Sequence, residues 1–176
     1  MYTSMKLLSR VLFWAVLFVI IFGLPVLAQN TKSIGSFGDW EAYKESDGSK
    51  PVCFIGSEPK KSQGKYKIRG ESYVLVTHRP AEKSTHVISI KAGYTYKATS
   101  EVDLVIGTQT FKLFTDAGHA FAYDNKTDRA IVKAMIRGAR MIIRGTSSRG
   151  TKTTDTYSLK GFSAAMKAIN KACKVT

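Results

Sequence analysis

Apolar and polar residues alternate along several short segments of the chain, which is the pattern of half-buried β-strands. The clearest case is Glu101–Ile106, where Val102, Leu104 and Ile106 share one face and the acidic residues occupy the other. Further strands are predicted at residues 39–43, 52–55, 73–77, 86–91, 111–114, 120–123, 140–145 and 152–159. The last two are separated by a Ser/Gly-rich turn and are expected to form a hairpin.

Two segments change to the period of a helix. In Asp128–Gly138 apolar residues recur every three to four positions, and we expect Asp128 to cap the start and Gly138 to end the helix. Phe162–Cys173 is rich in alanine and predicts an amphipathic helix that packs by one apolar stripe. That stripe consists of Phe162, Ala165, Met166, Ile169 and Cys173.

Together these elements predict one mainly β domain. Roughly eight short strands with turn signals between them favour an antiparallel β-sandwich of the immunoglobulin-like type, with a short internal helix and a C-terminal helix. Residues 29–38 are polar and are expected to form a loose lead-in. Residues 59–70 are rich in Lys, Ser, Gln and Gly, and are expected to form a solvated loop.

The first 28 residues have the three parts of a secretory signal peptide. Lys6 and Arg10 precede an apolar run from Val11 to Phe22, and a small residue, Ala28, offers a cleavage site. Cleavage there leaves residues 29–176 as a single domain with no transmembrane span. The alternative is an uncleaved anchor, because 18 residues from Val11 to Ala28 reach the lower limit for a spanning helix.

The chain has only two cysteines, Cys53 and Cys173. An exported protein resides where disulfides persist, so we expect these two to form one bridge that ties the C-terminal helix to an early strand. A reactive cysteine paired with a histidine is the alternative reading of the same residues.

Composition adds a strong basic bias. The chain carries 27 Lys and Arg against 13 Asp and Glu, a formal charge of +14. Without residues 1–28 the charge is still +12, which attracts anionic partners at low and moderate salt. Export argues against nucleic acid, so the expected partner is an envelope or host-surface component: a lipid head group, an acidic glycan or an acidic protein.

The basic residues gather in sequence around the predicted hairpin. We interpret five of them as a candidate anion-binding patch: Arg137, Arg140, Arg144, Arg149 and Lys152. Arginine can hold phosphate or carboxylate through two parallel hydrogen bonds. The alternative is that these are solvated charges on strand edges, where they discourage aggregation.

No residue pattern of an enzyme or a metal site is recognisable. His78, His86 and His119 are scattered, and neither metal-ligand spacings nor a G-x-S-x-G nucleophile turn occurs. We therefore expect no catalytic residues, no metal and no cofactor. An enzyme with an unrecognised site is the weakest of the hypotheses.

Several segments together resemble the invasion-associated locus B (IalB) family of bacterial cell-envelope proteins. The matching pieces are Gly38–Trp40, Cys53–Phe54, Gly93–Tyr94 with Tyr96–Lys97, Phe111–Phe114, Ala134–Met135 and, most specifically, Gly145–Cys173. The resemblance implies a small β-sandwich exported to the periplasm or outer membrane, without known catalytic residues. Many relatives carry another Cys shortly after the Gly-Asp-Trp, where this chain has Tyr43, so a second disulfide is not expected.

Export, charge and resemblance lead to one main hypothesis. The chain is predicted to be a non-enzymatic protein of the periplasm, outer membrane or cell surface that binds an anionic partner and contributes to host-cell interaction or invasion. The alternative is a periplasmic structural or stress-related envelope protein with no direct host contact, in which the charge serves only solubility. A family name alone does not transfer a function, so both hypotheses stay open.

Overall fold

A computed structural model describes residues 31–47 and 50–176 of the chain. The predicted signal peptide lies outside the described residues. In the described part of the chain, eleven strands form one continuous sheet in the order β1-β2-β3-β5-β6-β9-β8-β7-β10-β11-β4, and every pair is antiparallel. The strands are β1 (Lys32–Phe37), β2 (Trp40–Asp47), β3 (Lys50–Ser57), β4 (Lys61–Gly64), β5 (Tyr73–Arg79), β6 (Ser84–Lys91), β7 (Glu101–Ile106), β8 (Gln109–Asp116), β9 (His119–Phe121), β10 (Arg140–Thr146) and β11 (Lys152–Ser158).

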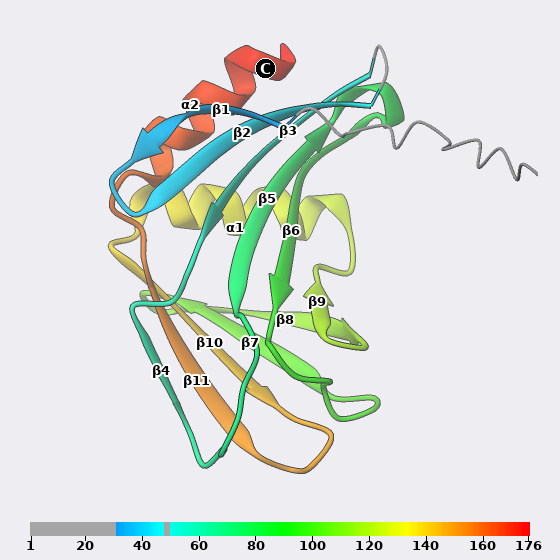
Figure 1. The fold of residues 1–176 in the computed structure, drawn as a ribbon, viewed down its shortest axis with the longest axis vertical. Coiled ribbons are helices and arrows are strands. Elements are labelled where there is room, and N and C mark those ends of the chain that lie inside the picture. Colours follow the sequence, from blue (N-terminus) through cyan, green and yellow to red (C-terminus); the bar gives the residue numbers. More distant parts are fainter. Residues whose placement is uncertain (1–30, 48–49) are drawn as a thin grey trace, which may run out of the picture.

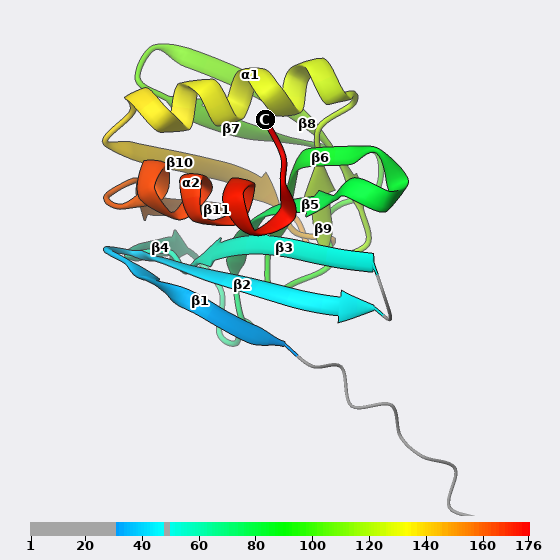
Figure 2. The same ribbon diagram turned by 90° about the horizontal axis from the view of Figure 1, so that it is seen from above.

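The sheet bends strongly, and two helices lie on its inner side (Figure 1, Figure 2). Helix α1 (Asn125–Arg137) packs mainly on β6, and helix α2 (Phe162–Cys173) packs on β1, β2 and β3. The indole N–H of Trp40 in β2 donates to the carbonyl of Ser158 at the end of β11, 3.0 Å away. This bond joins two strands that lie far apart in the order of the sheet, so the bent sheet encloses one core.

That core is built from the inward-facing residues of the alternating strands. Val102, Leu104 and Ile106 of β7 are buried, as the strict alternation of this segment predicts. Trp40 is fully buried and meets the ring of Phe162 edge to face, with 4.9 Å between the centroids. The prediction of a mainly antiparallel β fold with an internal and a C-terminal helix is confirmed, and the strands share one hydrogen-bonded sheet.

Two strands lie where the sequence predicts none. β1 occupies most of the expected lead-in at 29–38, and β4 lies within the expected loop at 59–70. Both are edge strands: among the described strands, β1 pairs only with β2, and β4 pairs only with β11. All four residues of β4 are exposed. No residue of either strand is fully buried, so neither strand shows the alternation of buried and exposed residues that identifies a strand in the sequence.

The internal helix begins earlier than predicted. Its cap is Asp124, whose carboxylate accepts a hydrogen bond from the backbone N–H of Thr127 at 2.7 Å. Asp128 is buried instead and accepts from the backbone N–H of Ile88 in β6 at 2.9 Å, while burial raises the pKa of its carboxyl group. The predicted cap at Asp128 is therefore wrong, whereas the end at Gly138 is confirmed.

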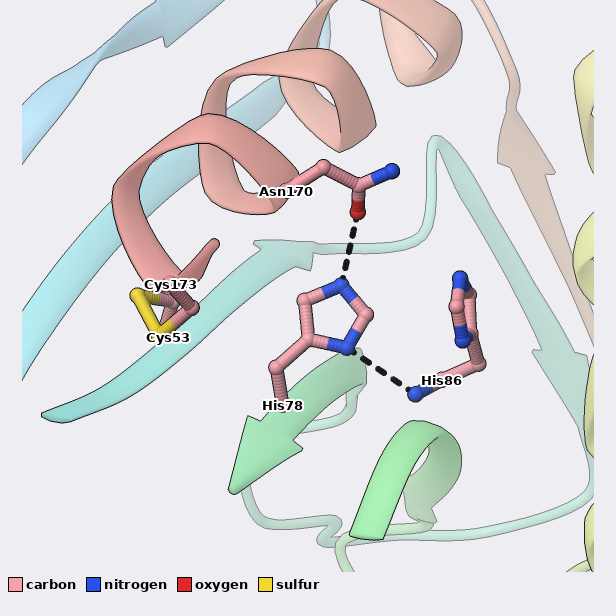
Figure 3. The surroundings of a disulfide bond; sticks show 5 residues. All are labelled: Cys53, His78, His86, Asn170 and Cys173. Atoms are coloured by element: carbon pink, nitrogen blue, oxygen red, sulfur yellow. Dashed lines mark hydrogen bonds between the residues drawn. A yellow bond between two sulfur atoms is a disulfide. The ribbon is translucent and has the colours of Figure 1, made fainter. Parts of the chain in front are cut away.

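The C-terminal helix matches the prediction in its bounds and in its buried stripe of Phe162, Ala165, Met166, Ile169 and Cys173. The predicted disulfide between Cys53 and Cys173 is present, with 6.0 Å between the Cα atoms (Figure 3). It joins the last residue of α2 to the middle of β3 across a sequence separation of 120. The helix is thus attached to the sheet by its apolar stripe and by a covalent bond.

Candidate functional site

A cleft of about 710 Å³ opens where the β4–β5 connection meets the β10–β11 hairpin. In Figure 1 the β4–β5 connection and the β10–β11 hairpin lie at the lower end of the sheet, remote from α2. The β4–β5 connection supplies residues 65–70, and the hairpin supplies residues 147–149, 151 and 153. A hydrogen bond from the backbone N–H of Gly70 to the carbonyl of Gly93, 2.9 Å long, attaches the connection to the segment after β6.

The cleft is built around a buried ion pair between Arg69 and Asp155. Two parallel hydrogen bonds of 2.7 and 2.6 Å join the guanidinium to the carboxylate, and both side chains are nearly inaccessible to solvent. The Nε–H of Arg69 donates to the carbonyl of Ala92 at 2.6 Å. Burial lowers the pKa of Arg69, but the hydrogen bonds and charge of Asp155 outweigh it, so the net shift is upward. The pair fixes the β4–β5 connection against β11.

Aromatic rings surround this arginine. Its guanidinium carbon lies 5.6 Å from the ring centroid of Tyr66 and 5.1 Å from that of Tyr94, within the range of cation–π attraction. The Tyr94 hydroxyl shares a 2.6 Å hydrogen bond with the hydroxyl of Thr153. Burial raises the pKa of Tyr94, so this phenol stays neutral at ordinary pH. The interior of the cleft therefore consists of aromatic rings and hydroxyl groups, which surround an ion pair with no net charge.

The rim of the cleft carries several positive charges. Lys65, Lys67 and Arg149 line it, and its lining includes no acidic side chain. Within the residues that the structure describes, none of these three forms a salt bridge. A neighbouring hollow shares Lys65 and Arg149 and adds Lys152. We call Lys65, Lys67, Arg149 and Lys152 the cationic rim.

The five residues of the sequence-based patch do not come together. Arg149 and Lys152 belong to the cationic rim. Arg137 and Arg140 line a separate cavity of about 850 Å³ between α1 and the β7–β8 turn. Arg144 is exposed on the outer face of β10, directly opposite Asp103 of β7. The structure thus divides the patch among three places on the surface.

Sequence reasoning missed half of the cationic rim and the ion pair beneath it. Lys65 and Lys67 fall in the segment expected to be a solvated loop, and Arg69 lies in the same run. The available signal was the order of residues from Lys65 to Arg69, in which basic side chains alternate with Tyr66 and Ile68. Basic residues interleaved with an aromatic and an aliphatic side chain are unusual for an ordinary solvated turn.

The histidines lie elsewhere and form no metal site. His78 and His86 pack edge to face beside the disulfide, with ring centroids 4.7 Å apart (Figure 3), and His119 lies on β9. Both cysteines are bonded to each other, so neither offers the thiolate that a cysteine–histidine nucleophile requires. In the described segments no cluster of three or more His, Cys, Asp or Glu is arranged to hold a metal ion. None of the described helices is long and apolar enough to cross a membrane.

Fold and site together define a basic, disulfide-bonded protein with a curved antiparallel sheet and a cationic cleft. The chain belongs to the family of invasion associated locus B (IalB) proteins, whose sequence model matches residues 40–170. This match confirms the resemblance drawn from the sequence. Comparisons with curated proteins and with solved structures give no significant match.

Proposed function

We propose that the protein is an exported, non-enzymatic IalB-type protein of the cell envelope that binds an anionic partner at the cationic rim. The observation that carries this proposal is the group of exposed cations on a cleft whose described lining residues include no acidic side chain. Like charges held close together repel one another, and an anionic ligand relieves that repulsion. The buried pair of Arg69 and Asp155 holds the rim in place, so little order has to be gained on binding.

Export and the absence of catalysis rest on separate support. IalB is not a known enzyme family, and a disulfide persists in the oxidising compartments outside the cytoplasm. The N-terminal apolar run with its basic leader has the layout of an export signal.

The proposal is tested by measuring binding of the chain without residues 1–28 to heparin and to phosphatidylglycerol vesicles at increasing salt. We expect binding to weaken as the salt concentration rises from low values to about 0.15 M, because dissolved ions screen the attraction between exposed charges. A variant with Lys65→Gln, Lys67→Gln and Arg149→Gln should lose most of it. A matched variant at the other cavity, with Lys133→Gln, Arg137→Gln and Arg140→Gln, removes the same charge and should retain it. Equal losses in both variants would reduce the effect to net charge.

Host contact is the finer part of the proposal, and it follows the invasion-associated description of the family. Protease shaving of intact cells, with a periplasmic protein as control, separates the two locations. Loss of the chain while the control survives supports surface exposure and host contact. Protection of both, with release by osmotic shock, supports the alternative of a periplasmic structural or stress-related protein.

A further inference from the structure

One aliphatic side chain at the cleft is almost fully exposed. Ile68 has a relative accessibility of 92%, the highest of the exposed large hydrophobic residues in the described part of the chain. It stands between Lys67 and the buried Arg69, whose ion pair with Asp155 attaches the connection to β11. Its neighbour Tyr66 is also partly exposed, at 37%. The β4–β5 connection therefore presents an apolar tip beside cations, on a fixed base.

We propose that this end of the sheet docks on an anionic membrane surface, with Ile68 entering the lipid headgroup region and the cationic rim contacting lipid phosphates. The inference rests on the proposed anion binding and names lipid phosphate as the anion. In this arrangement the cleft faces the bilayer, and the helices lie on the side away from it.

The combination of groups favours a membrane over a soluble acidic glycan or an acidic protein. Cations alone suit any of the three partners. An exposed isoleucine between basic residues contributes to binding only where an apolar phase lies next to anionic groups, as in a lipid bilayer. Peripheral membrane binding generally needs two signals, an inserted apolar group and basic residues near the surface. Tyr66 is amphipathic and suits the same interfacial depth.

The expected strength follows from these contributions. Each basic residue close to an anionic leaflet strengthens binding about fivefold, and full transfer of an isoleucine side chain out of water strengthens it by about tenfold or more. The four residues of the cationic rim and Ile68 together give reversible association rather than permanent anchoring. Each contribution is large enough that its removal should be readily measurable.

The test uses residues 29–176, which contain every described strand and helix and exclude the apolar run Val11–Phe22. Co-sedimentation is measured with phosphatidylglycerol-containing vesicles, with phosphatidylcholine vesicles, and separately with heparin. Ile68→Ser should weaken binding to the anionic vesicles about tenfold and leave heparin binding unchanged. Ile136→Ser on α1 is the matched control, because Ile136 is half exposed and lies away from the cleft.

An insertion signal makes the test independent of affinity. In Ile68→Trp the new indole should shift its emission to the blue and be quenched by brominated acyl chains when anionic vesicles are added. The native Trp40 is fully buried and provides a constant background. Because position 68 is exposed, neither Ile68→Ser nor Ile68→Trp is expected to impair folding.

The outcomes separate the two proposals. Heparin binding without vesicle binding, or vesicle binding that Ile68→Ser leaves unchanged, overturns membrane docking and retains anion binding with a glycan or protein as the partner. Failure to bind either probe at low salt overturns both proposals. Loss on Ile68→Ser together with quenching at position 68 supports docking.

Discussion

The imidazole of His78 donates a hydrogen bond from Nε2 to Oδ1 of Asn170, 2.8 Å away, and thereby attaches β5 to α2 (Figure 3). Nδ1 of the same ring accepts from the backbone N–H of His86 at 3.0 Å, so the ring holds its one proton on Nε2 and is neutral. His78 lies opposite Cys53 in the β3–β5 register, and Asn170 precedes Cys173 by one helical turn. The hydrogen bond and the disulfide therefore hold the same end of α2.

We expect the free energy of unfolding to fall as the pH drops below about 6.5. Burial lowers the pKa of His78. Burial, and then the charges of His78 and Arg129, lower that of His86. In the unfolded chain the two histidines take up protons as the pH falls through their ordinary pKa of 6.5. In the folded chain they take up protons only at a lower pH. The unfolded state thus binds more protons in this window, and stability declines with falling pH. Urea unfolding at about pH 7.5 and about pH 5.5 measures the change.

The control for this prediction is the variant with His78→Gln and His86→Gln. A glutamine at position 78 can still donate to Asn170 and accept from the backbone, but it does not titrate. The variant should lose much of the slope between the two pH values. The raised pKa of Asp128 has the opposite effect, since it makes the folded state bind more protons as the pH falls. Asp128 is present in both proteins, so its contribution cancels in the comparison. An unchanged slope would refute a role for the two histidines.

Replacing both cysteines by alanine should release the end of α2 before it affects the sheet. A disulfide across a long loop typically stabilises by about 2–4 kcal/mol, and an isolated helix as short as α2 is marginal in water. Changing Cys53 together with Cys173 avoids leaving a buried free thiol. Hydrogen exchange should accelerate most in α2, and uniform acceleration across the strands would contradict this order of events.

The buried pair of Arg69 and Asp155 predicts a strong coupling between two residues that are 86 positions apart. Asp155→Leu or Arg69→Met alone leaves a buried charge without its partner and should cost about 3–5 kcal/mol. The double variant Arg69→Met with Asp155→Leu should recover most of that loss, since apolar replacements of similar volume pack without a desolvation penalty. A urea double-mutant cycle measures the coupling, and additive losses would show that the pair acts as two independent residues.

The parts of the fold that follow from local pattern could be predicted from the sequence. β7 and α2 are confirmed to the residue, because a buried face imposes strict alternation on a strand and a three-to-four-residue period on a helix. The disulfide followed from the presence of only two cysteines. β1 and β4 could not be predicted in this way, because edge strands are defined by backbone hydrogen bonds with their neighbours.

The site was much less predictable, because distant parts of the chain make it. Arg69 and Asp155 meet only through the pairing of β11 and the path of the β4–β5 connection. Conversely, the arginines that are close in sequence were predicted to form one patch, but a strand advances about 3.3 Å per residue. Arg140 and Arg149 therefore lie at opposite ends of β10 and its turn, beside different cavities.

The start of α2 offers a final test, through a glycine that no other residue can replace without movement of the backbone. Gly161 caps the helix with φ of +92°, and a Cβ atom added there would lie 1.8 Å from the carbonyl oxygen of Phe37. Gly150, in the β10–β11 turn, has φ of +80° and nothing within 4 Å of such an atom. Gly150→Ala should therefore show only the cost of the left-handed backbone, about 1–2 kcal/mol.

Gly161→Ala adds the displacement of β1 from the start of α2, and we expect a total loss of about 2–5 kcal/mol. Urea unfolding of the two variants isolates the close approach, because the backbone penalty is nearly common to both. The backbone N–H of Asp39 donates to the carbonyl of Lys160 at 3.0 Å. Its amide proton should exchange faster with solvent in Gly161→Ala only. Equal losses in the two variants would mean that the chain around Phe37 yields easily, and that β1 contributes little to the position of α2.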